Sequence, residues 1–169
     1  MKTNLLGIAA IIIAATTFKV AQADAEDIVT AELYPEQHCL ALNIYYEARS
    51  SNLADMAATS DVVLNRVKDT RYPDTICEVV KQSYNDANGN PIRNKCQFSW
   101  WCDGKSDRPG DKDAWINAQY IAYKMLSEKS YIGISEGATH YHATYVSPSW
   151  VKEMQLVGRI GDHVFYRWE

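Results

Sequence analysis

The stretch Asn43-Ile-Tyr-Tyr-Glu-Ala-Arg-Ser-Ser51 sets one carboxylate, Glu47, among aromatic and aliphatic side chains. In a helix over residues 36–49, Leu40, Ile44 and Glu47 fall at i, i+4 and i+7, on the stripe that faces the protein interior. Desolvation there penalises the ionised form and favours a protonated carboxyl group. A protonated carboxyl group is the proton donor that cleavage of a glycosidic bond requires. The alternative is that Glu47 has a structural role and that its carboxylate forms an ion pair or a hydrogen bond with one of three partners: Arg49, Arg66 or a tyrosine hydroxyl.

The N-terminus has the three parts of a secretory signal peptide. A basic start at Lys2 precedes an apolar run from Leu5 to Phe18, and the small-residue site Ala21-Gln-Ala23 follows. The apolar run is shorter than the roughly 20 residues that span a bilayer. Residues 1–23 are therefore predicted to be a cleaved signal peptide, with a retained N-terminal anchor as the alternative. We expect a periplasmic or extracellular protein without stable membrane insertion after cleavage.

The rest of the chain is acidic and rich in aromatic residues. Without residues 1–23 the chain loses Lys2 and Lys19 and keeps 15 basic and 21 acidic side chains. This excess of acidic residues argues against a nucleic-acid-binding surface, and no local stripe of basic residues offsets it. The length fits one folded domain over residues 38–169, preceded by an N-terminal lead-in over residues 24–37. All five Trp and eleven Tyr lie in this part, whereas nothing in it indicates the oligomeric state.

Four cysteines remain after the predicted cleavage, at positions 39, 77, 96 and 102. An even count in an exported chain predicts two disulfides, and the lack of a Cys-x-x-Cys pair argues against a zinc site. Three pairings are possible. We favour Cys96–Cys102, which closes the loop over residues 97–101, together with Cys39–Cys77, which links the first helix to the next region.

Capping residues predict where three more helices begin. Asn52, Thr75 and Asp111 each precede a helical pattern and can accept hydrogen bonds from free backbone N–H groups of the first turn. The helix after Thr75 is expected to be short and to end near Gln82. The two long helices carry core stripes at helical spacing: Leu53, Met56, Ala57, Ser60, Leu64 and Val67 in one, and Trp115, Ala118, Ile121, Ala122 and Met125 in the other.

The pattern changes from helical to strand-like after Ser130. Residues 137–143 alternate as a strand does, and residues 158–166 form a second strand-like segment with a turn at Gly161-Asp162. Asp86-Ala-Asn-Gly-Asn-Pro91 is the strongest turn signal and suits a hairpin or an exposed loop. The expected fold class is α+β, mostly helical with a small antiparallel sheet in the C-terminal part.

Five segments occur in the order of a known family. They are residues 39–49, 62–67, 96–104, 137–143 and 161–166, and they include the motifs Tyr-Glu-Ala-Arg, Gln-Phe-Ser and Gly-Ala-Thr-His-Tyr-His. Together they resemble the SleB-type cell wall hydrolases, the family of the spore cortex-lytic catalytic domain. The resemblance covers residues 38–167. It implies a lysozyme-like fold and cleavage of peptidoglycan between N-acetylmuramic acid and N-acetylglucosamine.

The resemblance also implies roles for single residues. The catalytic Glu of the family maps onto Glu47, and its cleft-wall segments map onto two sets of substrate-binding residues: Gln97, Phe98 and Ser99, which Trp100 follows, and His140, Tyr141 and His142. Peptidoglycan glycan strands are the expected partner, with no metal and no cofactor. The chain departs from the family at Ser50-Ser51 and Asp55-Met56, where the family has Gly-Glu and Gly-Gln, so substrate preference is not carried over.

A lytic transglycosylase is the mechanism that we favour from this resemblance. Glu47 first protonates the glycosidic oxygen and then takes a proton from the C6 hydroxyl of the muramic sugar, which closes a 1,6-anhydro ring. This route needs one carboxylate, whereas hydrolysis normally needs two. Hydrolysis remains the alternative, because five more acids are available as a second group: Asp55, Asp61, Asp103, Glu136 and Asp162.

Two other functions compete with glycosidic cleavage. A zinc-dependent peptidoglycan amidase would use His140, His142 and His163 as ligands and Glu47 as base. A non-catalytic domain would instead bind glycan through exposed aromatic residues: Phe98, Trp100, Trp101, Tyr141 and Tyr145. Core packing is the competing role for Trp100 and Trp150.

Overall fold

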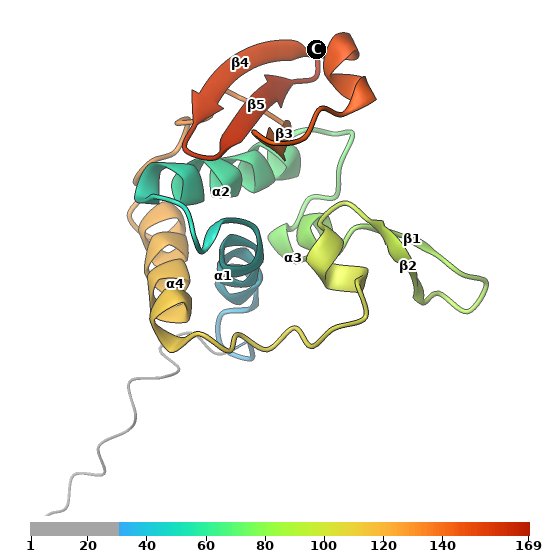
Figure 1. Ribbon diagram of the computed structural model, residues 1–169. Coiled ribbons are helices and arrows are strands. Elements are labelled where there is room, and N and C mark those ends of the chain that lie inside the picture. The colour runs from blue at the N-terminus through green and yellow to red at the C-terminus, as the bar shows by residue number, and fades with distance from the viewer. Residues whose placement is uncertain (1–30) are drawn as a thin grey trace, which may run out of the picture.

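The computed structural model describes residues 31–169. The predicted signal peptide, residues 1–23, lies outside this range. The elements are α1 (Pro35–Ala48), α2 (Leu53–Lys68), α3 (Ile76–Val80), β1 (Ser83–Asn85), β2 (Pro91–Cys96), the 3-10 helix η1 (Ser99–Cys102), α4 (Lys112–Leu126), β3 (His140–Ala143), the 3-10 helix η2 (Ser149–Glu153), β4 (Gln155–Ile160) and β5 (His163–Arg167). Helices dominate the first part and a small antiparallel sheet the last (Figure 1), so the α+β prediction is confirmed.

The predicted caps determine where three helices begin. The side chains of Asn52, Thr75 and Asp111 accept hydrogen bonds from backbone N–H groups three residues later, in the first turns of α2, α3 and α4. Each cap satisfies a group that the helix itself leaves free. The helix α3 is shorter than expected and ends at Val80. The helix α1 has no side-chain cap but begins with Pro35, whose missing N–H costs nothing at that position.

The larger core lies among the four α-helices and η1. The helix α1 contacts α2, α3 and α4, and Leu40 and Ile44 on its inner stripe are fully buried. The predicted stripes of α2 and α4 also pack in this core, except that Leu53 is 46% exposed because it opens α2 at the surface. The disulfide Cys39–Cys77 joins α1 to α3, as predicted.

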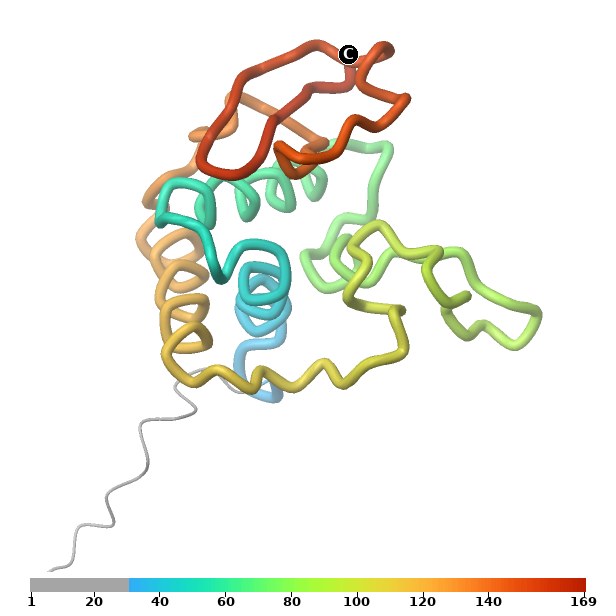
Figure 2. The backbone as a smooth tube through the Cα atoms, in the orientation of Figure 1, coloured from blue at the N-terminus to red at the C-terminus, as the bar shows by residue number. Residues whose placement is uncertain are grey.

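The strands β1 and β2 form an antiparallel hairpin that projects from the helical body (Figure 2). Its turn occupies residues 86–90, where the Asp86 carboxylate accepts hydrogen bonds from the backbone N–H groups of Asn88 and Asn90. The second predicted disulfide, Cys96–Cys102, joins the end of β2 to η1. This cross-link turns the chain back toward α1 directly after the hairpin.

The C-terminal sheet lies across α2 (Figure 1) in the strand order β3-β5-β4. It packs through a small second core of four buried residues: Ala58, Val62, Ala138 and Phe165. The turn between β4 and β5 approaches α2 so closely that a Cβ atom on Gly161 would lie 2.6 Å from the Asp55 Cβ atom. Gly161 also has a φ angle of +57°, which favours glycine. A larger residue at this turn would displace the sheet from α2.

Candidate active site

Glu47 lies in the last turn of α1, where the helix meets the C-terminal sheet. Its side chain is partly exposed, and the Tyr141 hydroxyl of β3 donates a hydrogen bond to Glu47 Oε2 at 3.2 Å. A tyrosine hydroxyl is one of the partners that the sequence suggested. The structure therefore brings Glu47 next to Tyr141 in the segment 140–142, although the two residues are 94 positions apart in the sequence.

The surroundings of Glu47 favour its protonated form. Burial is the largest influence and raises the pKa of Glu47, against smaller opposing effects of the Tyr141 hydrogen bond and of the charges of His163 and Arg66. This agrees with the direction expected from the helix stripe. Burial also raises the pKa of Tyr141 well above its usual value of 10.0, with the Glu47 charge acting the same way. Tyr141 therefore remains a hydrogen-bond donor to the carboxylate.

A buried hydrogen-bonded pair, Asp55 and His163, packs against Tyr141. Asp55, which is fully buried, accepts a hydrogen bond at 2.8 Å from Nδ1 of His163 and another at 2.9 Å from the Asp162 backbone N–H. The edge of the His163 ring contacts Tyr141 with ring centroids 5.1 Å apart. Burial raises the pKa of Asp55, but the hydrogen bonds from His163 and Asp162 outweigh it and leave that pKa lowered. Asp55 is therefore ionised, and it holds His163 in place against the Tyr141 ring.

Arg66 supplies positive charge near Glu47 without binding it directly. Its side chain is 5% exposed, and Nε donates a hydrogen bond at 2.7 Å to the carbonyl oxygen of Thr139. The guanidinium lies over the rings of Tyr72 and Phe98, 5.2 and 5.3 Å from their centroids. Within residues 31–169 Arg66 forms no ion pair, so its charge stabilises ionised Glu47 through space while leaving the carboxyl group free to exchange a proton.

Among the described residues, no second carboxylate forms a hydrogen bond with Glu47 or shifts its pKa. The groups that shift its pKa are a tyrosine, a histidine and an arginine. Asp61 is engaged elsewhere, since it accepts hydrogen bonds from the backbone N–H groups of Gly133 and Ser135 and from the Ser135 hydroxyl. Three more candidates form no hydrogen bond or ion pair with Glu47 within residues 31–169: Asp103, Glu136 and Asp162.

The first predicted wall segment divides into surface and core residues. Gln97 and Ser99 are exposed, whereas Phe98 and Trp100 are 3% and 5% exposed. The Trp100 indole N–H donates a hydrogen bond at 3.1 Å to Oδ1 of the buried Asn43. The turn into η1 directs both rings into the core, and the substrate-binding roles of Phe98 and Trp100 stay predictions.

The histidines of β3 face away from Glu47. Strand alternation places Tyr141 on the inner face with His163, and His140 and His142 on the outer face, where both rings contact Trp150. The substrate-binding roles of His140 and His142 stay predictions, on the face of β3 that is opposite to Tyr141. The zinc alternative fails, because no group of three possible ligands comes together in the part of the chain that the structure describes.

Sequence reasoning missed the Asp55–His163 pair and the hydrogen bond between Asn43 and Trp100. The sequence offers Asp55 as a second carboxylate and His163 as a zinc ligand, and not as partners of each other. They lie 108 residues apart, and no motif links them. The one available signal was the helix position of Asn43, which is four residues before Glu47 and therefore on the same helix face.

Comparison with known proteins gives one family and two similar structures. The model of the cell wall hydrolase family matches residues 50–166, beginning just after Glu47. The catalytic domain of the Bacillus cereus SleB protein is 18% identical, with a TM-score of 0.52, over 78% of this chain and 89% of that domain. The catalytic domain of the germination-specific lytic transglycosylase SleB from Bacillus anthracis is 19% identical, with a TM-score of 0.53, over 78% and 93%. These structures establish the shared fold. Curated protein sequences give no match.

Proposed function

Because the chain belongs to the cell wall hydrolase family and is a peptidoglycan-degrading enzyme, we propose that it cuts glycan strands as a lytic transglycosylase. The bond cleaved is the one between N-acetylmuramic acid and N-acetylglucosamine, and Glu47 is the general acid and then the general base. The observation that carries this proposal is a single carboxyl group with a raised pKa and no carboxylate partner. Hydrolysis by inversion or retention normally uses two carboxyl groups.

The reaction then has two proton transfers at one residue. Protonated Glu47 gives its proton to the glycosidic oxygen, the bond from that oxygen to C1 of the muramic sugar breaks, and positive charge develops at C1. Ionised Glu47 next accepts the proton of the C6 hydroxyl, whose oxygen attacks C1 and closes the 1,6-anhydro ring. Glu47 ends protonated and no water is consumed.

The neighbours of Glu47 suit both halves of this cycle. Burial keeps the proton on Glu47 before the first transfer, while Tyr141, His163 and Arg66 stabilise the carboxylate between the two transfers. Acid–base catalysis of this kind contributes about 10²–10⁴-fold in rate. Tyr141 also fixes one carboxyl oxygen, which leaves the other to face the substrate.

The proposal includes export. Cleavage after Ala23 would release the chain beyond the cytoplasmic membrane, where its substrate lies and where disulfides form. Two disulfides within residues 31–169 support this location. Among the described helices, none has both the length and the apolar character of a membrane span.

Digestion of purified peptidoglycan tests the mechanism directly. We expect anhydro-muropeptides from the wild type, lighter by one water than hydrolytic products in mass spectrometry. The variant Glu47→Gln should release at least about a hundredfold less product. As a matched control, Glu153→Gln removes an exposed carboxylate from η2 and should leave the rate unchanged.

Other products would point to other functions. Reducing ends formed with water would retain Glu47 but replace the transglycosylase with a hydrolase. Free stem peptides would indicate an amidase. Binding to peptidoglycan without any released fragment would indicate a glycan-binding domain, and full activity of Glu47→Gln would show that the catalytic residue is another one.

A further inference from the structure

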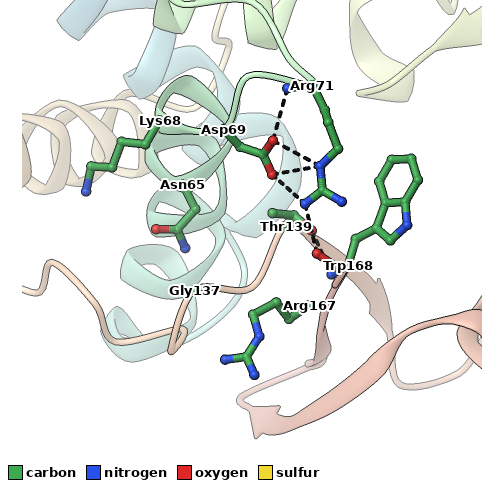
Figure 3. A pocket seen from close by; sticks show the side chains of 8 residues that line it. All are labelled: Asn65, Lys68, Asp69, Arg71, Gly137, Thr139, Arg167 and Trp168. Carbon is green, nitrogen blue, oxygen red and sulfur yellow. Dashed lines mark hydrogen bonds and ion pairs between the residues drawn. The ribbon is translucent and has the colours of Figure 1, made fainter.

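A cavity of about 280 Å³ lies beside the Glu47 site and does not include Glu47. Its walls come from the C-terminal end of α2, the residues after it, the segment before β3, and the end of β5 (Figure 3). Ligand pockets for drug-sized molecules are usually about 300–1,000 Å³. The cavity therefore has room for one compact group, such as a single carboxylate-bearing residue.

The lining of this cavity is positively charged in an otherwise acidic protein. It contains three cations, Lys68, Arg71 and Arg167, and one acid, Asp69. Asp69 is already neutralised, because both of its carboxylate oxygens accept hydrogen bonds from Arg71. Lys68 is exposed and forms no ion pair within residues 31–169. An entering anion would therefore find at least one cation without a carboxylate partner.

The carboxylate that pairs with Arg167 belongs to an exposed residue. Arg167 Nε donates a hydrogen bond at 2.9 Å to Glu169, whose side chain is 69% exposed. Such a solvent-exposed pair contributes little and can be replaced by a competing anion. The two terminal nitrogens of Arg167 donate to neutral acceptors, Gln155 Oε1 and the Glu136 carbonyl oxygen, so an entering anion would replace these contacts as well as the pair with Glu169.

The neighbourhood of the cavity carries a further sign of positive potential. The pKa of His140 is lowered to about 4, by burial first and then by the charges of Arg66 and Arg71. These positive charges act on His140 from α2 and from the segment that follows it, although Asp69 pairs with Arg71 there. Negative ligands are favoured by the same field.

One wall of the cavity is a fixed aromatic surface. The Trp168 backbone N–H donates a hydrogen bond at 3.2 Å to the Thr139 hydroxyl, and Arg71 donates one at 2.8 Å to the Trp168 carbonyl oxygen. The Arg71 guanidinium also lies 4.5 Å from the centroid of the Trp168 ring. The site is therefore held in place by the fold before a ligand arrives, which reduces the entropic cost of binding.

The cavity is connected to the catalytic region through β3 and α2. Thr139 lines the cavity, and Tyr141, two residues further, binds Glu47. Two residues of extended chain span roughly 7 Å. The carbonyl of Thr139 is also the acceptor of Arg66, so one rigid segment connects the two sites.

We propose that this cavity binds a carboxylate of the acidic peptide stem that branches from the muramic sugar of peptidoglycan. The proposal rests on the function proposed above, since the muramic sugar at Glu47 would direct its stem to a neighbouring surface. Arg167 binds the carboxylate. The Lys68 side chain extends away from Arg167 (Figure 3) and attracts the carboxylate over a longer distance. The enzyme then prefers strands that carry peptides over strands without them.

Binding of a synthetic stem tetrapeptide tests this proposal without requiring any cleavage. Calorimetry with the full chain should show binding of the tetrapeptide with free carboxylates and at least about tenfold weaker binding of its amidated analogue. Arg167→Gln should weaken binding of the free acid by about tenfold, Lys68→Gln should weaken it by a smaller factor, and both should leave the binding of the amide unaffected. Lys95→Gln removes an exposed cation from β2 and should change nothing.

Two further arms identify the source of the anion and separate this proposal from the catalytic one. Equal binding of acid and amide, or displacement of the tetrapeptide by inorganic phosphate at equal concentration, would overturn the proposal. On peptidoglycan, Lys68→Gln should slow cleavage of peptide-bearing strands and leave strands stripped of peptide unaffected, whereas equal slowing of both would overturn it. Tetrapeptide binding with no anhydro product would retain this site and refute the transglycosylase.

Discussion

Replacing Tyr141 with phenylalanine removes one hydroxyl group and leaves the ring that packs against His163 and Phe165. The lost interaction is the 3.2 Å hydrogen bond to Glu47 Oε2. That bond favours ionised Glu47 and so lowers its pKa. In Tyr141→Phe the pKa of Glu47 should therefore rise, and Glu47 becomes a weaker acid that keeps its proton at higher pH.

The magnitude follows from the geometry of this hydrogen bond. A hydrogen bond to a charged group contributes about 1.5–3 kcal/mol. The 3.2 Å length and the partial exposure of Glu47 place this one at the lower end. About 1.4 kcal/mol corresponds to tenfold in rate. We therefore expect kcat to fall about tenfold at low pH, where Glu47 is protonated in both proteins.

A pH profile of kcat on purified peptidoglycan, with released muropeptides quantified, measures both effects. The alkaline limb should move to higher pH in Tyr141→Phe while the acid plateau falls. Tyr46→Phe is the matched control, because its hydroxyl donates a hydrogen bond of the same 3.2 Å length to the Ser106 carbonyl oxygen and none to Glu47. An alkaline limb that stays in place, or that moves to lower pH, would refute the assigned role of Tyr141.

Three further predictions concern stability and are measured by denaturant unfolding. Asp55→Asn should lower the free energy of unfolding by about 3 kcal/mol at pH 7, because His163 loses its buried charged partner. Since the pKa of Asp55 is lowered in the folded state, the wild type should lose this advantage as the pH falls below the ordinary Asp value. A difference in stability that stays the same at low pH would contradict the assignment. Glu47→Gln should be more stable than the wild type at neutral and alkaline pH, because a raised pKa of Glu47 means that the wild type loses stability as the pH rises through that pKa. In acid the free energies of unfolding of the two proteins should become equal. A variant that is less stable than the wild type at neutral pH would argue against a desolvated carboxylate. Loss of Cys39–Cys77, which closes 38 residues, should cost about 4 kcal/mol, against about 2 kcal/mol for Cys96–Cys102, which closes 6; equal costs would show that loop closure does not dominate.

Local signals in the sequence were sufficient for most of the fold. The caps Asn52, Thr75 and Asp111 act within their own first turns, and the turn at residues 86–90 is determined by its own side chains. The setting of Glu47 was also predictable, because helix periodicity alone places it beside Leu40 and Ile44. These features depend on neighbours within a few residues, which a single sequence displays.

The remaining features of the site depend on contacts across the chain. The strand over residues 140–143 was predicted, but its orientation was not, and orientation decides whether Tyr141 or the two histidines face Glu47. The inward turn of Phe98 and Trp100 depends on the position of η1 against α1. The Asp55–His163 pair forms only when the β4–β5 turn reaches the start of α2, where Gly161 permits the close approach.

The catalytic residues lie on two parts of the fold that differ in how strongly they are stabilised. Glu47 is on the cross-linked helical part, whereas its hydrogen-bond donor Tyr141 is on a sheet that carries no disulfide and rests on a four-residue core. Heating should loosen the sheet first, so that amide protons of β3–β5 exchange with deuterium at temperatures where the helices are still protected. Enzymatic activity should then disappear reversibly at a temperature several degrees below the one at which the circular dichroism of the helices changes. The stability of the sheet would therefore set the upper temperature limit of activity.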